Sequence, residues 1–314
     1  MITQAATALS GLPERVQIYE VGPRDGLQNE DVVIPVATKA EFIRRLIAAG
    51  LEAVELTSFV PSSWIPQLGD AEELLGLLGD LPGRHPVLTP NERGLERALA
   101  CGVSEIAVFG SATESFAQRN LNRSVADSIE MFAPVVKRAR GEGLNVRGYV
   151  SMCFGDPWEG AVSPAQAADV VLALAELGCT EVSLGDTIGV ATPGQVAALL
   201  DELLGRGLPM AQIAVHFHDT YGQALANTLG ALQHGVTTVD TSAGGLGGCP
   251  YAGSATGNLA TEDLVWQLHG LGIATGVDLA ALCETSLWMA KLLGRPSPSR
   301  VLAALAPTFS QEGN

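Results

Sequence analysis

Short apolar or β-branched runs recur along the chain, and each is followed by an amphipathic segment of helical length. This alternation is typical of successive parallel βα units, and eight such units can be counted. The predicted strands are Val16–Val21, Ala53–Thr57, Pro86–Thr89, Glu105–Phe109, Asn145–Met152, Glu181–Leu184, Ile213–His218 and Thr238–Ser242.

The segments between these runs carry helix signals. Residues 37–50 (ATKAEFIRRLIAAG) and 163–178 (SPAQAADVVLALAELG) have apolar positions at helical spacing and end in glycine. Eight such units favour a closed (β/α)₈ TIM barrel, an α/β fold, over an open doubly wound sheet, which counting alone does not exclude. We expect one domain over residues 1–314, with the barrel at about 16–276. A C-terminal helical extension at about 277–314 should hold one extra helix, from about Asp278 to Leu293.

Composition narrows the class of partner. The chain has 314 residues, 47% of them hydrophobic, and a formal net charge of −16 from 34 acidic and 18 basic residues. This balance argues against nucleic acid or an anionic membrane as the main partner. The five cysteines form no CxxC pair and no apolar stretch is long enough to span a bilayer. A reducing, cytoplasmic setting is therefore expected.

Polar motifs fall where a barrel of this kind does its chemistry, at the C-terminal ends of strands and in the loops after them. They are Arg24 and Asp25 after the first predicted strand, Glu55 and Thr57 on the second, Asp186 after the sixth, His216 and His218 ending the seventh, and a glycine-rich loop after the eighth. The sequence thus predicts a polar site at the open end of the barrel.

The segment VHFHD places His216 and His218 two residues apart on a strand. Because side chains alternate along a strand, both imidazoles should face one side and Phe217 the other. With Asp25 they form a mixed nitrogen and oxygen ligand set that suits Mn²⁺, Fe²⁺, Zn²⁺ or Mg²⁺. The alternative is that the histidines only hydrogen-bond within the mouth, and the polar groups beside them favour the metal site.

Two further motifs allow more than one interpretation. Asn258, in TGNLATED, has the local pattern of an N-cap for the eighth helix, although its amide oxygen could instead bind the metal. Arg24 and Asp25 lie together in EVGPRDGLQNE, where Pro23 and Gly26 impose an unusual backbone path. Such a pair usually indicates a surface loop, but a guanidinium beside a metal ligand could stabilise charge developing on a substrate oxygen.

The loop AGGLGGCPYAGSATGN contains six glycines, which suits either phosphate contact or a mobile lid. Cys249 lies at its middle. A free cysteine is often an inert small apolar residue, but over a polar mouth it is a candidate acid/base or nucleophile. The only lysines, Lys39, Lys137 and Lys291, all fall in predicted helices, so a Schiff-base mechanism lacks its amine and carbon–carbon chemistry would rely on a metal.

Five motifs in the same order give the chain a family resemblance. It resembles the hydroxymethylglutaryl-CoA lyases, within the wider group of metal-dependent lyase and aldolase barrels, from about Val16 to Gly276. The motifs are EVGPRDGLQNE, ELTSFV with WIPQLGD, SLGDTIG, VHFHDTYGQALANTL, and GGLGGCPYA with GNLATEDLV. The resemblance implies a TIM barrel that cleaves 3-hydroxy-3-methylglutaryl-CoA to acetyl-CoA and acetoacetate with Mg²⁺ or Mn²⁺, in leucine or ketone-body-type catabolism.

The resemblance also implies roles for individual residues. Arg24 would stabilise the enolate of the departing thioester and, with Gln28, contact the substrate, while Cys249 would transfer a proton. Glu55, Asp186 and His216 match further acidic or basic positions of the catalytic site. The implied metal ligands are Asp25, His216, His218 and Asn258. The partner is an acyl-CoA, and the resemblance leaves open whether the barrel forms a homodimer.

The sequence departs from the family pattern at two places. Asp31 stands where a lysine is usual, and SMCFGDPWEG carries Met152 and Asp156 where cysteines are usual, with Cys153 shifted by one. These changes leave open a lyase for a related 3-hydroxy-3-alkylglutaryl-CoA or for citramalyl-CoA. An alkylmalate-synthase-like condensing enzyme would normally carry an additional C-terminal region, and a non-catalytic barrel is disfavoured because the polar set is retained.

Overall fold

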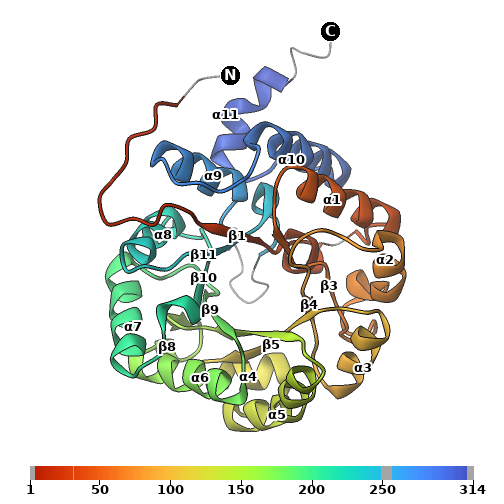
Figure 1. Ribbon diagram of the computed structural model, residues 1–314, viewed down its shortest axis with the longest axis vertical. Helices are drawn as coiled ribbons and strands as arrows, with labels where there is room; N and C mark the ends of the chain where they lie inside the picture. The colour runs from red at the N-terminus through yellow and green to blue at the C-terminus, as the bar shows by residue number, and fades with distance from the viewer. Residues whose placement is uncertain (1–3, 31, 249–256, 310–314) are drawn as a thin grey trace.

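The computed structural model describes residues 4–30, 32–248 and 257–309, and its strands form one curled parallel sheet (Figure 1). The sheet order is β2-β1-β11-β10-β9-β6-β5-β4-β3. The strands are β1 (Gln17–Glu20), β2 (Ala53–Val54), β3 (Thr57–Ser58), β4 (Val87–Leu88), β5 (Glu105–Ser111), β6 (Asn145–Ser151), β9 (Glu181–Asp186), β10 (Ile213–Phe217) and β11 (Thr238–Thr241). All eight predicted strand positions are occupied.

The sheet closes on itself through the second predicted strand. This strand is split, and its two pieces, β2 and β3, stand at opposite ends of the sheet order. The Val54 and Leu56 amides donate to the carbonyls of Arg84 and Pro86, both at 3.0 Å. Pro86 has no N–H to return a bond, so the ladder is interrupted there. The predicted TIM barrel is therefore confirmed.

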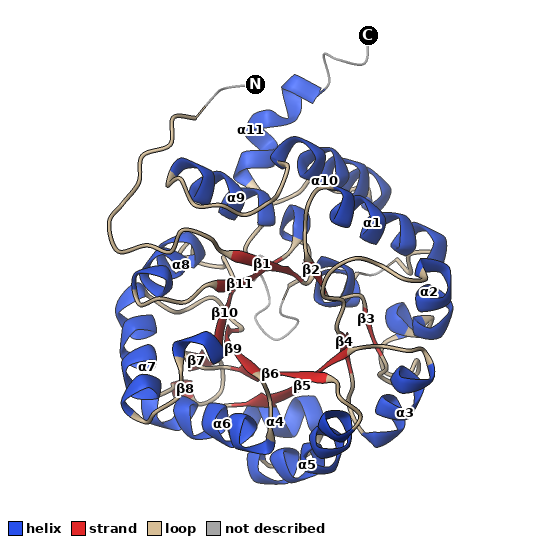
Figure 2. Cartoon of the chain, in the orientation of Figure 1, coloured by secondary structure: helices blue, strands red, loops and turns tan. Residues whose placement is uncertain are grey.

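Helices surround the barrel on its outer side (Figure 2). They are α1 (Val36–Ala48), α2 (Ala71–Leu78), α3 (Glu92–Ala100), α4 (Glu114–Leu121), α5 (Val125–Gly141), α6 (Pro164–Leu177), α7 (Pro193–Gly205), α8 (Ala224–Gln233), α9 (Thr261–Gly270), α10 (Leu279–Leu293) and α11 (Arg300–Phe309). Their apolar faces and the outward-facing strand residues form one large buried cluster, which includes Phe42, Val135 and Leu199. Burial of this apolar surface is the main term that holds the layers together.

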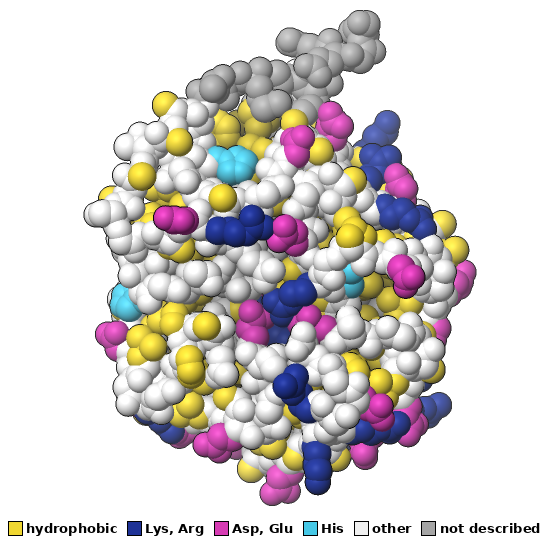
Figure 3. All heavy atoms as spheres, viewed as in Figure 1, with side chains coloured by type: hydrophobic (Ala, Val, Ile, Leu, Met, Phe, Trp, Pro, Cys, Tyr) yellow, Lys and Arg dark blue, Asp and Glu magenta, His cyan; other side chains and the backbone are white. Residues whose placement is uncertain are grey.

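The inside of the barrel carries charged side chains beside a small apolar cluster that includes Tyr19, Val21 and Tyr149. Arg147 is fully buried, with its guanidinium 3.6 Å from the centroid of the Tyr19 ring. Arg84 lies on the same tyrosine at 5.3 Å and donates to Glu105 at 2.5 Å and to Glu181 at 3.1 Å. Acidic and basic side chains also gather at the centre of the face in Figure 3. Each buried charge is thus offset by a partner.

Two features differ from the sequence prediction. A small hairpin, β7 (Gly155–Asp156) with β8 (Gly160–Ala161), follows β6. The expected extra helix is present as α10, and a second helix that was not predicted, α11, follows it. Asp263 on α9 accepts hydrogen bonds from Ser299 Oγ at 2.7 Å and the Val301 amide at 2.8 Å. This contact adds to a local cap of α11, in which Ser299 Oγ accepts from the Leu302 amide at 3.0 Å, so Ser299 was an available local signal.

No helix among the described residues is long and apolar enough to cross a bilayer. All three lysines lie in helices, as predicted. Lys39 on α1 is buried and donates to both carboxylate oxygens of Asp70 at 2.9 Å, and also to the Gln67 carbonyl. It holds the short 3₁₀ turn Pro66–Leu68 and the start of α2 against α1.

Replacing Lys39 with methionine is expected to lower the free energy of unfolding by about 1.5–3 kcal/mol, since hydrogen bonds to a charged group are lost. Turnover should persist, because Lys39 lies outside the barrel mouth. Urea unfolding followed by circular dichroism measures the first effect, and Lys137→Met, at an exposed position of α5, is the matched control. Loss of turnover in a folded Lys39→Met protein would contradict this structural role.

Candidate metal centre

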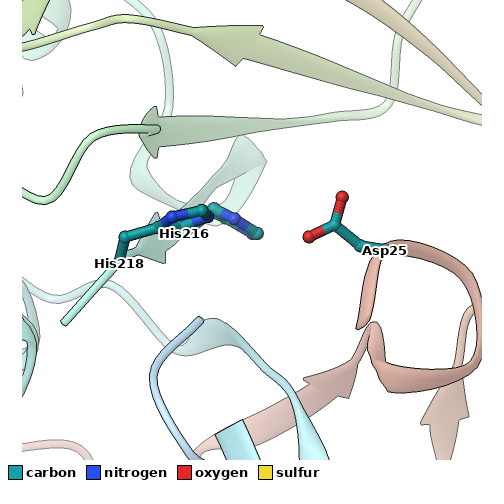
Figure 4. Close-up of side chains that lie close together, drawn as sticks. All are labelled: Asp25, His216 and His218. Atoms are coloured by element: carbon teal, nitrogen blue, oxygen red, sulfur yellow. The ribbon is translucent and has the colours of Figure 1, made fainter. Parts of the chain in front are cut away.

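His216 and His218 stand at the C-terminal end of β10. Their imidazoles point the same way, toward Asp25, with ring centroids 5.2 Å apart (Figure 4). Phe217 between them points outward and packs on Phe154, with ring centroids 6.2 Å apart. This is the alternation that a strand imposes. The outward phenylalanine anchors the strand while the two histidines face the mouth.

Asp25 reaches the mouth from a π-helical turn, Gly22–Gly26, directly after β1. The Asp25 and Gly26 amides donate to the Val21 carbonyl at 2.8 and 3.1 Å. A Cβ on Gly26 would lie 2.7 Å from Ser242 Oγ and 2.9 Å from Leu246 Cβ, so no larger residue fits. Single π turns are frequent at functional sites, because the wider loop re-aims a side chain.

The carboxylate and the two imidazoles form one cluster. One ligand atom from each of Asp25, His216 and His218 lies within 4.8 Å of the others. Two nitrogens and one oxygen are borderline donors that suit Mn²⁺, Fe²⁺, Zn²⁺ or Mg²⁺. The structure thus brings together the three residues from which the sequence predicted a metal site.

Asn258 is not the N-cap that its local pattern favours, because α9 begins at Thr261 with Ala260 as its N-cap. Instead Asn258 forms an antiparallel bridge with His218. Its Nδ2 donates to Asp25 Oδ2 at 2.9 Å and to the Leu246 carbonyl at 3.0 Å. Its Oδ1 is buried and has no hydrogen-bond partner among the described residues. An unpaired acceptor beside the cluster fits a fourth ligand.

The protonation states favour metal binding. Burial raises the pKa of Asp25, but Arg24 and His216 outweigh it, and the pKa falls to about 2. Burial lowers the pKa of His218 to about 3, with a further contribution from His216. Asp25 is therefore ionised and His218 neutral at neutral pH, which are the forms that bind a metal.

Arg24 is held on two sides. Its Nε donates to Glu55 Oε2 and its Nη1 to Asp25 Oδ1, both at 2.7 Å. Tyr149 Oη donates to the same Glu55 oxygen at 3.1 Å, and its ring centroid lies 5.4 Å from the guanidinium. Burial raises the pKa of Glu55, against the lowering effect of Arg24. Sequence reasoning missed Tyr149, whose only signal is its inward-facing place on β6.

The other predicted site residues are placed less centrally. Asp186 ends β9, where its carboxylate accepts from the Val190 and Ala191 amides at 2.9 and 3.0 Å, and burial raises its pKa to about 6. Gln28 is half-buried just after the π turn. Cys249 lies outside the described residues, as does Asp31.

Asp240 is a second residue that sequence reasoning missed. It lies on β11 beside His216, with its Oδ2 3.3 Å from His216 Nδ1. Burial raises the pKa of Asp240, but Arg147 and His216 outweigh it and hold the pKa below its ordinary value. A carboxylate in the middle of the buried run TVDT was the available signal, because such a group needs a partner.

Glu20 joins the π turn to the loop after β11. Its carboxylate accepts from the Gly22 and Ala243 amides, both at 2.8 Å, and from Thr261 Oγ1 at 2.6 Å. Burial raises its pKa from 4.5 to about 7. The native state therefore binds this proton more tightly than the unfolded chain, so the contribution of Glu20 to stability is present below pH 4.5 and lost as pH rises through 7.

We expect Glu20→Gln to unfold with nearly the parent free energy at pH 4.5 and to be more stable than the parent at pH 8, by roughly 1–3 kcal/mol. The amide keeps an acceptor for the two backbone N–H groups and can donate to Thr261. Urea unfolding at several pH values measures the difference, with exposed Glu176→Gln as control. A constant difference from pH 4.5 to 8 would contradict the assignment.

Fold and site together define a class of protein, a TIM barrel with a candidate divalent-metal centre at the C-terminal mouth. The family profile described as HMGL-like matches residues 15–288. The chain belongs to the HMGL-like family, so the resemblance read from its motifs is confirmed.

Individual relatives cover nearly the whole chain. The cytoplasmic 3-hydroxy-3-methylglutaryl-CoA lyase of Rattus norvegicus is 50% identical over 302 residues, which is 96% of this chain and 88% of the rat protein. Among solved structures, hydroxymethylglutaryl-CoA lyase from Pseudomonas aeruginosa has 47% identity and a TM-score of 0.92 over 95% of this chain and 99% of its own.

A more distant solved relative carries ligands. It is an HMG-CoA lyase from Acenitobacter baumannii in complex with coenzyme A and 3-methylmalate, with 35% identity and a TM-score of 0.88 over 95% and 96% of the two chains. Relatives at about 50% identity are named as cytoplasmic or as mitochondrial lyases.

Proposed function

We propose that the protein is a divalent-metal-dependent carbon–carbon lyase that cleaves 3-hydroxy-3-methylglutaryl-CoA to acetyl-CoA and acetoacetate. The observation that best supports the proposal is the contact between Arg24 and the metal cluster, in which Arg24 Nη1 donates a hydrogen bond to Asp25 Oδ1. It places a permanent positive charge beside a candidate metal ligand, in a chain 50% identical to a protein named for this activity.

The reaction breaks the bond between C2 and C3 of the substrate. The tertiary alcohol on C3 must lose its proton, and an enolate then develops on the thioester side. A divalent ion in this site would make the alcohol more acidic and orient it. The proposed ligands, Asp25, His216, His218 and Asn258, would hold that ion. The unpaired Asn258 Oδ1 and the donor types of the other three fit it.

Arg24 would stabilise the enolate oxygen. Its guanidinium is buried and held by Glu55 and Asp25, so it needs little reorganisation when the charge develops. Glu55 would act as its anchor, in turn held by Tyr149. Gln28, just past the same turn, would contact the substrate.

Two proton transfers complete the proposed mechanism. The alcohol proton must pass to a base at the mouth, for which Asp186 is the candidate. The pKa of Asp186, raised to about 6 by burial, suits proton exchange near neutral pH. The carbon of the enolate must then gain a proton, and Cys249 is the proposed donor, from its place in the sequence and the family resemblance.

The test is product analysis on purified protein. With Mn²⁺ or Mg²⁺ added, 3-hydroxy-3-methylglutaryl-CoA should yield acetyl-CoA and acetoacetate in equal amounts, and a chelator should abolish the reaction. Comparing the turnover rates with Mn²⁺ and with Mg²⁺ shows which metal supports the faster reaction. No turnover with either metal, in protein that binds the metal, would overturn the proposal.

A second candidate is a lyase for a 3-hydroxy-3-alkylglutaryl-CoA with a longer branch, or for citramalyl-CoA. Met152 favours it: this residue is fully buried, adopts φ 60° and joins none of the hydrophobic clusters of the described residues. Its amide donates to Thr187 Oγ1 at 2.9 Å, near the mouth. A change at this place would reshape an acyl pocket. Parallel assays with each thioester distinguish these candidate substrates, since the true substrate has the highest kcat/KM.

The proposed ligand and setting follow from the relatives. An acyl-CoA is supported by the solved relative that holds coenzyme A. The cytoplasm is supported by the rat relative's name. A condensing activity of the alkylmalate-synthase kind has no support among the lyases to which the chain is similar.

A further inference from the structure

A buried carboxylate lies directly behind one of the two histidines. His216 on β10 and Asp240 on β11 are register partners on neighbouring parallel strands. His216 Nδ1 is buried, forms no hydrogen bond of good geometry among the described residues, and lies 3.3 Å from Asp240 Oδ2, which is an ion-pair distance. The nearest partner of this ring nitrogen is therefore Asp240.

Asp240 is itself held in place from the far side. Arg147 Nη2 donates to Asp240 Oδ1 at 2.5 Å, and Ser183 Oγ donates to Oδ2 at 2.9 Å. All three side chains are buried. The carboxylate cannot rotate away from His216 without breaking both bonds inside the barrel.

Arg147 is equally constrained. Its guanidinium lies on the Tyr19 ring at 3.6 Å, and its Nη1 lies 3.3 Å from Glu181 Oε1. The chain of contacts thus runs from the charged interior of the barrel, through Arg147 and Asp240, to the mouth. Asp240 is the residue of this chain that contacts the candidate metal cluster, through His216.

We propose that Asp240 is a positioning residue that holds His216 in the tautomer protonated at Nδ1, with Nε2 left as the metal ligand. A carboxylate that accepts from Arg147 and Ser183 offers only lone pairs toward His216, so this contact favours the proton on Nδ1. Neutral imidazole has one N–H, which leaves the lone pair of Nε2 for the ion. A ligating histidine usually depends on a partner of this kind for its tautomer, orientation and basicity.

The two histidines of the site differ in this respect. The Nδ1 atoms of both histidines are buried and form no hydrogen bond among the described residues, but within that part of the chain only His216 Nδ1 has a carboxylate oxygen at ion-pair distance. The His218 ring is fixed by burial and by the bridge with Asn258 rather than by a carboxylate. The orienting role of Asp240 is therefore specific to His216, which the lyase proposal makes a metal ligand.

The first test needs no substitution in the protein measured. In metal-free protein labelled with ¹⁵N-histidine, the His216 ring should give the nitrogen shifts and couplings of the Nδ1–H tautomer. The resonances are assigned by their loss in His216→Asn. An Nε2–H tautomer would overturn the proposal, whatever the activity of the enzyme.

The second test measures metal affinity. In Asp240→Asn, with Arg147 still bound to the amide oxygen, Nδ2 faces His216 and donates, so the histidine proton moves to Nε2 and blocks the ligand atom. Mn²⁺ binding, followed by electron paramagnetic resonance, should weaken about 10- to 100-fold. Affinity equal to that of the parent, in folded Asp240→Asn protein, would overturn the proposal.

Two controls separate positioning from general disturbance of the interior. Ser183→Ala removes a hydrogen bond to the same oxygen but leaves that oxygen as an acceptor for His216. Arg84→Met disrupts another interior ion pair that does not touch Asp240. Both should bind Mn²⁺ about as tightly as the parent, and weakening equal to that of Asp240→Asn would show a structural role only.

The inference rests on the proposed metal centre, and the two can fail separately. Parent protein that does not bind Mn²⁺ would refute the metal centre, while the tautomer measurement would still test Asp240. If Asp240→Asn does not fold, the ¹⁵N measurement of the His216 tautomer in the unmodified chain tests the proposal by itself.

Discussion

Replacing Arg24 with methionine is expected to lower kcat about 10²- to 10³-fold, the usual cost of removing one preorganised group that stabilises an oxyanion. The guanidinium lies 2.7 Å from both Glu55 Oε2 and Asp25 Oδ1 and is buried. Its charge acts most strongly as the enolate develops, so kcat should fall more than KM changes. Steady-state kinetics with the thioester substrate measure both.

The control must account for the Glu55 carboxylate, which remains buried when Arg24 is removed. Removal of Arg24 leaves Glu55 fully buried and without its ion pair, which costs stability. The double variant Arg24→Met with Glu55→Gln removes that problem, whereas Glu55→Gln alone keeps the guanidinium. Near-normal kcat in the folded double variant would refute a catalytic role for Arg24. Arg24→Lys should recover little, since an ammonium cannot make the two-sided contact.

His218→Leu is expected to weaken Mn²⁺ binding and to lower kcat/KM by about 10²-fold or more at micromolar metal, because an ion supplies several kcal/mol of charge stabilisation. His218 is buried, and burial lowers its pKa to about 3. It is therefore neutral in the fold, and an apolar residue of similar size leaves no charge unpaired. Mn²⁺ titration and kinetics over a range of metal concentrations measure the effect.

Phe217→Leu is the matched control for this variant. It changes the neighbouring residue on the same strand, but on the outward face, where Phe217 packs on Phe154. It should lower stability and leave metal affinity intact. Partial rescue of His218→Leu by excess Mn²⁺ is expected. If both variants bind Mn²⁺ like the parent, His218 is not a ligand and the histidine pair only hydrogen-bonds in the mouth.

Much of the fold was predictable because its signals are local. Strand and helix periods follow from adjacent residues, so all eight strand positions were found. The extension was predicted with one helix too few: the local cap Ser299 was overlooked, and the rest of the cap of α11 comes from Asp263 on another helix. The split of the second strand depends on Pro86 of its neighbour. Such features belong to pairs of segments, and no single window of sequence contains them.

The sequence by itself determined the alternation that makes a barrel and the two histidines on one strand face, because both depend on spacings of a few residues. Only the tertiary structure decided what stands around them. It pairs Asn258 with Asp25 across 233 positions and makes it a candidate ligand rather than a cap. It also sets Asp240 behind His216, and Glu55 beside Arg24. These partners meet because parallel strands end at one mouth, and closure of the sheet sets which strand ends are neighbours.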